Sequence, residues 1–439
     1  MMCKDICLDS QAILLLTAPL IIGRQNSQVR PLTHAEYKRL VLRLRELGRK
    51  PADLFASDAE AVLQDLRSVT DPERMKQLLE RSFQLSQAIE RWRARSIHIL
   101  TRADSDYPQR LLKLMGKERP AVLYCCGDRS LLKEGGLAVV GSRNASNQTL
   151  DYAAAVGQLA AEAGRTIISG QAKGIDQAAM YGALEAGGNA VGIVACNLER
   201  TIMNRDNRNL IKEGRLVCLS PYDPNIGFNV GHAMQRNKLI YAFSDLALVV
   251  NSSYGSGGTW NGALEQLDKF QWVPVYTRSS GEACEGLEGL RNKGARPWPN
   301  PQSPEELNSF FANHYLLHGQ SIEKQSAEQE EGQITKQTDI TPQASLTTHQ
   351  CQPEPLREET FRPADEIYAT AKEVITKLLY QPKKDTEIAE DMDVSLSQVR
   401  AWLKRLVNEG VVTRKERPVR YVLNGARQLS LPLVQNRQS

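Results

Sequence analysis

The chain has 439 residues, which is too long for a single hydrophobic core and predicts two or three domains. Its composition, 41% hydrophobic and 24% charged, is that of a soluble globular protein, and a net charge of only +4 leaves any affinity for nucleic acid to local patches. Eight cysteines without C-x-x-C pairs argue against a disulfide framework or a zinc site, and favour free thiols in a cytoplasmic protein.

Residues 1–95 are predicted to form an N-terminal helical domain. An early apolar run is broken by Pro19 and Gly23 and is too short to cross a membrane, so we interpret it as a buried helix and expect no membrane partner. Leucines recur at helical spacing after Thr33, a typical N-cap residue. Residues 24–50 carry eight Lys and Arg against two Glu. A nucleic-acid surface and a solvated helix face would both explain this excess, and we favour the helix face.

Two short strands are expected next, at 97–100 and 121–125, joined by a turn at Tyr107-Pro108 and a short helix. We expect them to extend the sheet that follows. Cys125 and Cys126 lie at the end of the second strand. Since no second cysteine cluster exists, we interpret them as structural thiols rather than as a redox or metal site.

Residues 137–188 contain two consecutive strand–turn–helix units, with strands at 137–140 and 165–169. Two such units imply a parallel sheet wrapped by helices, in which the loops after the strands gather at one edge. The turns supply glycines that allow close approach, hydroxyl groups and positive charge, which together predict a site for an anion. The residues are Gly141, Ser142, Arg143, Ser169, Gly170, Lys173 and Gly174.

The same pattern continues to residue 318. Strands are expected at 190–195, 216–219 and 246–250, and a third glycine-rich loop at 254–259 leads directly into a helix. Three loops that each lead to a helix N-terminus at one edge predict a phosphate track suited to a polyanion. We add to the candidate site three residues of the helix at 232–243 and three of the third loop: Arg236, Asn237, Lys238, Gly257, Gly258 and Thr259.

Five segments, in this order, resemble the DNA-processing protein A family, also called DprA or Smf. They are Asp104–Pro108, Leu123–Asp128, Val139–Arg143, Ser169–Asp176 and Ala183–Gly188. The resemblance covers about residues 97–278 and implies a Rossmann-like domain that binds the phosphates of single-stranded DNA on the loops named above.

Individual roles follow from the same resemblance. It implies that Arg143 contacts phosphate and that Ser169-Gly170 with Lys173 forms a second anion loop, although the family usually has arginine where this chain has Lys173. The Arg236-Asn237-Lys238 segment also matches the family. Phe228 matches an aromatic residue that stacks on a base, but the segment from it to Arg236 is longer here than in most members, so an anchor in the core or loop is an equal alternative.

The function that the resemblance implies is that of a DNA-binding homodimer that helps to load RecA recombinase onto single strands in transformation or recombination. We expect no enzymatic activity, no cofactor and no metal. One alternative is a nucleotide sensor or phosphoribohydrolase-like enzyme that uses the same loops. Such enzymes place a glutamate three residues after the loop threonine, whereas here the first glutamate after Thr259 is Glu265.

The C-terminal part is predicted to be a linker at 319–362, polar and without aromatic residues up to residue 360, followed by a domain at 363–426. Three helices and a β-hairpin are typical of a winged helix. DNA binding and protein binding are both open for it, and a winged-helix transcriptional regulator is a further alternative. Its candidate basic patch comprises Arg400, Lys404, Arg405, Arg414, Lys415 and Arg417.

Overall fold

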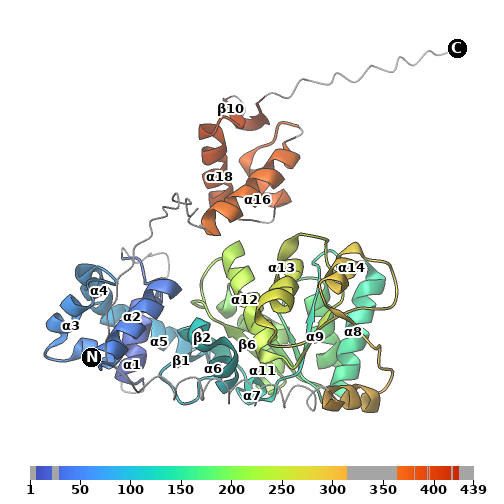
Figure 1. The fold of residues 1–439 in the computed structure, drawn as a ribbon, viewed down its shortest axis with the longest axis horizontal. Helices are drawn as coiled ribbons and strands as arrows, with labels where there is room; N and C mark the ends of the chain where they lie inside the picture. The colour runs from blue at the N-terminus through green and yellow to red at the C-terminus, as the bar shows by residue number, and fades with distance from the viewer. Residues whose placement is uncertain are drawn as a thin grey trace, which may run out of the picture. The chain divides into compact units, whose positions relative to one another are not determined.

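The computed structural model describes residues 6–21, 29–313, 363–379, 381–392, 394, 396–416 and 419–424. The chain forms two compact units, one within residues 1–336 and one within 337–439 (Figure 1). The predicted linker and Arg417 lie outside the described residues. Among the helices that are described, none is both long and apolar enough to span a membrane.

The first unit begins with five α-helices and a 3₁₀ turn, η1. Their bounds are α1 (Leu8–Thr17), α2 (His34–Glu46), η1 (Pro51–Phe55), α3 (Ala59–Asp65), α4 (Pro72–Leu79) and α5 (Ser82–Arg93). The apolar run is buried in α1, as expected. Thr33 caps α2 in a capping box: its hydroxyl accepts the Glu36 amide at 3.2 Å, and the Glu36 carboxylate accepts the Thr33 amide at 2.7 Å.

A nine-stranded sheet forms the centre of this unit, in the order β1-β2-β6-β5-β4-β3-β7-β8-β9. The pairs β1-β2 and β2-β6 are antiparallel, and all other pairs are parallel. The first two strands therefore extend the sheet, as expected. The strands are β1 (His98–Thr101), β2 (Val122–Cys126), β3 (Leu137–Val140), β4 (Ile167–Ser169), β5 (Ala190–Ile193), β6 (Leu216–Ser220), β7 (Leu246–Val249), β8 (Val275–Thr277) and β9 (Arg296–Pro297).

Helices cover both faces of the sheet (Figure 1). Alternate residues of β3 belong to different hydrophobic clusters, Leu137 and Val139 to one and Ala138 and Val140 to the other, so the strand is buried on both sides. The helical segments between the strands are α6 (Gln109–Met115), η2 (Gly116–Glu118), α7 (Leu131–Glu134), α8 (Asn147–Glu162), α9 (Ile175–Glu185), α10 (Leu198–Met203), α11 (Arg205–Lys212), α12 (Val230–Phe243), α13 (Gly257–Glu265), the π-helical turn η3 (Gln266–Phe270) and α14 (Glu285–Asn292).

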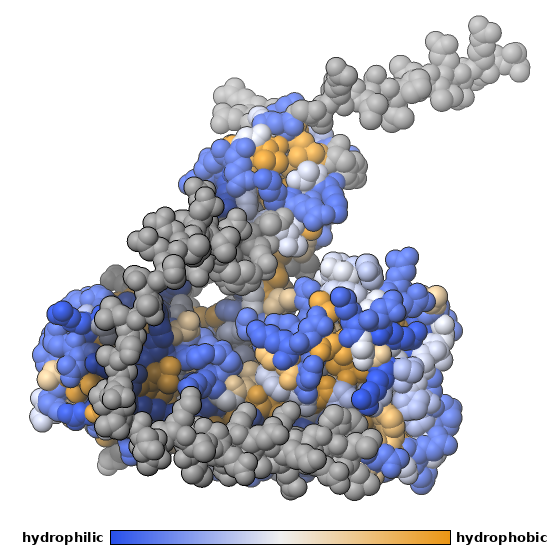
Figure 2. Space-filling model, in the orientation of Figure 1, coloured by the Kyte–Doolittle hydropathy of each residue, from blue (hydrophilic) through white to orange (hydrophobic). Residues whose placement is uncertain are grey.

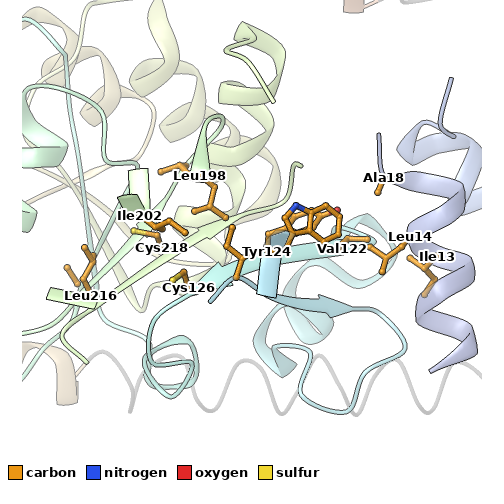
Figure 3. Close-up of a cluster of buried hydrophobic side chains, with 14 of the residues drawn as sticks. Ile13, Leu14, Ala18, Val122, Tyr124, Cys126, Leu198, Ile202, Leu216 and Cys218 are labelled. Atoms are coloured by element: carbon orange, nitrogen blue, oxygen red, sulfur yellow. The ribbon is translucent and has the colours of Figure 1, made fainter. Parts of the chain in front are cut away.

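The N-terminal helices share a core with the sheet. Ile13 and Leu14 of α1 lie in the same cluster as Val122 and Tyr124 of β2 (Figure 3). Trp92 of α5 packs edge-on against Tyr124, with ring centres 5.0 Å apart. The helices and the sheet thus fold as one compact unit. Figure 2 shows hydrophilic residues over much of its surface, with hydrophobic residues between them.

The buried cysteines have the structural character that the sequence predicted. Burial raises the pKa of Cys125 to about 12 and also raises the pKa of Cys126. Both therefore remain neutral thiols at physiological pH. Among the described residues, no group of His, Cys, Asp and Glu is arranged to hold a metal ion.

The described residues of the second unit form three helices followed by two antiparallel strands, in the order that the sequence predicted. They are α16 (Pro363–Leu378), α17 (Asp385–Asp391), α18 (Leu396–Asn408), β10 (Val412–Glu416) and β11 (Val419–Leu423). Ile375, Leu403 and Val412 belong to one hydrophobic cluster, so the helices and the strand pair form a common core.

Candidate nucleic-acid interface

Three loops meet at the carboxyl edge of the sheet, after β3, β4 and β7. The Ser142 amide donates to Asn251 Oδ1 at 2.7 Å, and the Thr259 hydroxyl donates to the Gly141 carbonyl at 3.0 Å, which joins the first loop to the third. The Ile175 amide donates to the Ser142 carbonyl at 3.4 Å and joins the second loop to the first. The order of the strands, with β3 between β4 and β7, brings these loops together.

The glycines of the first two loops allow the loops to pack against each other. A Cβ at Gly141 would lie 2.6 Å from Ile175, and a Cβ at Gly170 would overlap the Arg236 guanidinium. Gly174 has a φ of 87° and faces the Ser142 carbonyl, so both its backbone and its surroundings require glycine. The sequence predicted that these glycines leave room for a ligand, whereas in the structure the room is filled by the protein itself.

Asp176 holds the first two loops together by accepting their backbone amides. It was not among the site residues predicted from the sequence. Its buried carboxylate accepts the Gly170 amide at 3.1 Å and also the amides of Gly141 and Ala172. Burial raises the pKa of Asp176, while the nearby Arg236 and these amides oppose the rise. The amides of Gly141, Gly170 and Ala172 are therefore already hydrogen-bonded to Asp176 and are not free to bind an anion. Ser169 is also buried, and its hydroxyl donates to the Val139 carbonyl at 2.6 Å.

A cavity of about 520 Å³ opens beside these loops, between α9, α10 and the segment around Phe228. We call it the Arg236 cavity. Four cationic side chains line it: Arg143, Lys173, Arg200 and Arg236. Among the described residues that line it, none is Asp or Glu. The cavity therefore has the charge that a phosphate ligand requires.

Arg236 is the buried cation of this cavity, with only 7% of its surface exposed. Burial lowers its pKa, and the Asp176 carboxylate opposes that shift. Its Nε and Nη1 atoms are buried without a hydrogen-bond partner in the described structure. Unmet donors on a buried guanidinium are costly, and an anion accepts from these two atoms only after a local movement opens them to the cavity.

Aromatic side chains accompany these cations. The Arg143 guanidinium lies 5.5 Å from the centre of the Phe228 ring, and both residues line the cavity. Tyr181 of α9 also lines it and is 42% exposed. Tyr181 and Arg200 were not among the predicted site residues, because neither follows a glycine-rich turn and α10 was not predicted as a separate helix.

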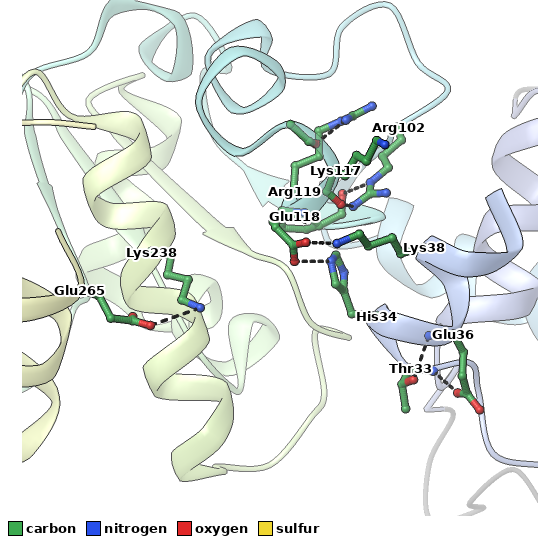
Figure 4. Close-up of polar contacts among 12 residues, drawn as sticks. Thr33, His34, Glu36, Lys38, Arg102, Lys117, Glu118, Arg119, Lys238 and Glu265 are labelled. Atoms are coloured by element: carbon green, nitrogen blue, oxygen red, sulfur yellow. Dashed lines mark hydrogen bonds and ion pairs between the residues drawn. The ribbon is translucent and has the colours of Figure 1, made fainter. Parts of the chain in front are cut away.

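The other predicted residues lie outside the Arg236 cavity. Asn237 donates to the Gly258 carbonyl at 3.1 Å and so supports the third loop, in which Gly257 and Gly258 are exposed. Lys238 lies 3.6 Å from Glu265 and lines a different cavity (Figure 4). The structure thus brings together the cations of the first two loops and Arg236, but not Lys238.

Two of the basic residues predicted for the C-terminal unit are paired with acids. Arg400 contacts Asp385 at 2.7 Å, and Arg405 contacts Glu409 at 3.2 Å. Lys404 and Lys415 are exposed. Arg414 lies in β10, but its side chain is outside the described part. The net positive charge of this patch is therefore smaller than the number of basic residues suggests.

Solved structures with a similar fold include two DNA processing proteins. The protein from Streptococcus pneumoniae aligns with a TM-score of 0.49 and 22% identity, over 63% of this chain and 93% of that one. The protein from Helicobacter pylori, studied for its single-stranded DNA binding mode, aligns with a TM-score of 0.40 and 24% identity, over 49% of this chain and 94% of that one.

Sequence relatives show the family directly. The family model of DNA recombination-mediator protein A matches residues 98–307. Protein Smf of Escherichia coli is 32% identical over 233 residues, which span 51% of this chain but only 60% of that protein. DNA processing protein DprA of Streptococcus pneumoniae is 30% identical over 213 residues, which span 48% of this chain and 74% of that protein. The chain therefore belongs to the DNA-processing protein A (DprA/Smf) family.

Proposed function

We propose that this chain binds single-stranded DNA in the Arg236 cavity and does not cleave it. The observation that carries the proposal is a cavity lined by four cations and, among its described residues, by no carboxylate, with unpartnered donors on a buried arginine. The DNA processing protein A of Helicobacter pylori binds single-stranded DNA, and membership of the same family supports the same ligand here.

In the proposed mode, backbone phosphates contact the exposed Arg143, Lys173 and Arg200, and one phosphate accepts from Arg236. Unstacked bases pack on the rings of Phe228 or Tyr181. Since phosphates and ring faces are common to all sequences, binding has little sequence preference and depends strongly on salt.

Binding without cleavage is supported by the position of the acids. Asp176 is buried behind the loops with its oxygens accepting backbone amides, and Glu265 faces Lys238. Neither carboxylate lines the Arg236 cavity, so neither is placed to act as a general base on a ligand there.

The wider role in the proposal comes from the family resemblance: a cytoplasmic homodimer that helps to load RecA recombinase onto single strands during DNA uptake or recombination. The three helices and strand pair of the second unit fit a winged helix. Its exposed Lys404 and Lys415 suit either DNA or an acidic protein surface.

Fluorescence polarisation of a labelled oligo(dT) tests the proposal. Arg143→Ala and Lys173→Ala are expected to weaken binding about ten-fold each, because each removes a charge-assisted phosphate contact. Lys212→Ala, on α11 and outside the cavity, is the matched control. Duplex DNA and deoxynucleoside monophosphates serve as competitors. Equal affinity for wild type and both cavity variants would refute the site.

A further inference from the structure

A second cavity is also bordered by α12. It has a volume of about 820 Å³ and is bordered by α1, α2, β2, α12 and η3. We call it the Phe270 cavity. Gln235 and Lys238 of α12 line it, whereas Arg236 lines the first cavity. Neighbouring residues of α12 therefore line the two cavities.

Aromatic pairs form much of the wall of the Phe270 cavity. Phe270 stacks on Trp272, with ring centres 4.4 Å apart and planes inclined by 20°. Tyr222 stacks on His232 at 4.0 Å and 18°. All four rings line the cavity and are only partly buried. Partly exposed ring faces of this kind are what stacks on unpaired bases in proteins that bind single strands.

Positive charge lies beside these rings. The Lys238 and Lys269 ammonium groups each lie 5.3 Å from the centre of the Phe270 ring. Lys269 is exposed, whereas Lys238 also faces Glu265. The combination of ring faces and an accessible cation matches a nucleotide, which carries a flat base and an anionic phosphate.

The two carboxylates that line this cavity are engaged by other groups. Glu118 pairs with Lys38 and, at 3.6 Å, with His34 (Figure 4), and the bond from Lys38 holds the pKa of Glu118 below its usual value. Asp223 is 2% exposed and accepts the amides of Ile21 at 3.1 Å and Asn225 at 3.0 Å. Their repulsion of an incoming phosphate is therefore reduced.

We propose that the Phe270 cavity holds further nucleotides of the same DNA strand, with bases stacked on the ring of Phe270 and a phosphate contacting Lys269. This inference rests on the proposed function of the Arg236 cavity. A strand is favoured over a free nucleotide because α12 and the loop before it line both cavities: Phe228 lines one, and Ile226, two residues earlier, lines the other.

The test compares oligo(dT) of about 4 and about 16 nucleotides on the full chain. Phe270→Leu retains apolar bulk but removes the ring, and Lys269→Gln removes an exposed charge. Both are expected to weaken binding of the longer oligonucleotide five-fold or more and to leave the shorter one unchanged. Phe270→Tyr keeps the ring and restores wild-type affinity. The control is Phe83→Leu, at an exposed position of α5.

Tryptophan emission gives a second readout. The longer oligonucleotide is expected to quench the tryptophan emission of the wild-type protein but not that of the Trp272→Phe variant, because a base stacks beside Trp272.

The outcomes distinguish this inference from the proposed function. If Arg143→Ala weakens binding of both oligonucleotides, while Phe270→Leu and Lys269→Gln bind the longer one as tightly as wild type, this inference is wrong and the proposed function stands. If Arg143→Ala weakens neither, the proposed function itself fails. Quenching by deoxythymidine monophosphate as strong as that by the longer oligonucleotide would show a free-nucleotide site and overturn the strand assignment.

Discussion

At the scale of single residues, the sequence indicated the cations of the site but not their surroundings. Arg143 and Lys173 follow glycines in βα turns, a pattern that can be recognised from neighbours in the chain. The burial of Arg236 beside Gly170 and Asp176 depends on contacts between residues sixty or more positions apart. No local pattern encodes such a contact, so the role of Asp176 could not be predicted.

Gly170→Ala is expected to weaken binding of single-stranded DNA ten-fold or more. The backbone at this position allows alanine, but the added Cβ would overlap the Arg236 guanidinium and displace it. Oligonucleotide polarisation measures the effect, and thermal unfolding separates it from a loss of fold. Gly262→Ala on α13 is the control, because its Cβ would make only ordinary contacts at 3.5 Å. Unchanged affinity of Gly170→Ala would contradict the role of Arg236.

Protection of Cys196 from alkylation tests whether DNA occupies the Arg236 cavity. Its thiol lines the Arg236 cavity, and burial raises its pKa while Arg236 and Arg143 oppose the rise. Alkylation at mildly alkaline pH is expected to slow several-fold when oligonucleotide is bound, since the ligand covers the thiol. Cys284 lies outside the cavity and is the internal control in the same peptide map. Equal protection of both thiols, or of neither, would count against the site.

At the scale of elements, periodicity and turn signals predicted strands β1 to β7 and the long helices between them, but not β8, β9 or α10. That helix has only six residues and buries only Leu198 and Ile202, too few for a helical period to be visible. Tertiary contacts hold it: Arg91 of α5 donates two hydrogen bonds of 3.1 Å to Glu199. Arg200, the next residue, lines the Arg236 cavity, so the N-terminal helices help to position a residue of the candidate site.

The N-terminus of α2 gives a pH prediction. The hydrogen bond from Arg74 lowers the pKa of Glu36 to about 2, below its ordinary value of 4.5. A carboxyl with a lowered folded pKa stabilises the fold above pH 4.5 and loses this contribution as the pH falls toward 2. Glu36→Gln should therefore lower the free energy of unfolding by about 1–2 kcal/mol at pH 7, and by less at pH 3.5.

Urea unfolding at the two pH values measures this difference. Glu46→Gln, at the exposed end of the same helix, is the control, because its ion pair with Arg43 is exposed to solvent. A deficit of Glu36→Gln that stays the same at both pH values would show that the charge of Glu36 does not contribute, since glutamine keeps an oxygen that can accept the Thr33 amide.

At the scale of the whole molecule, composition predicted several domains but not which segments share a core. The contact between Trp92 of α5 and Tyr124 of β2 spans β1, α6 and η2 in the chain, and many such contacts place α1–α5 and the sheet in one compact unit. The sequence of a segment shows how apolar it is but not which partner it packs against, because that depends on shape complementarity. The meeting of the three loops, by contrast, follows from parallel-sheet topology and was predictable.

The salt dependence of binding tests which of the two units contacts single-stranded DNA. A strand whose phosphates contact the four cations of the Arg236 cavity should give a slope of about −3 for log affinity against log salt concentration, and Arg143→Ala should reduce its magnitude by about 0.7. Lys404→Ala with Lys415→Ala, in the second unit, should leave the slope for single-stranded DNA unchanged, because the proposed site is lined by residues of the first unit. Polarisation titrations of the full chain at several salt concentrations measure both slopes. An equal reduction by the double variant would show that the second unit also contacts the strand, and the first unit would then not account for binding by itself.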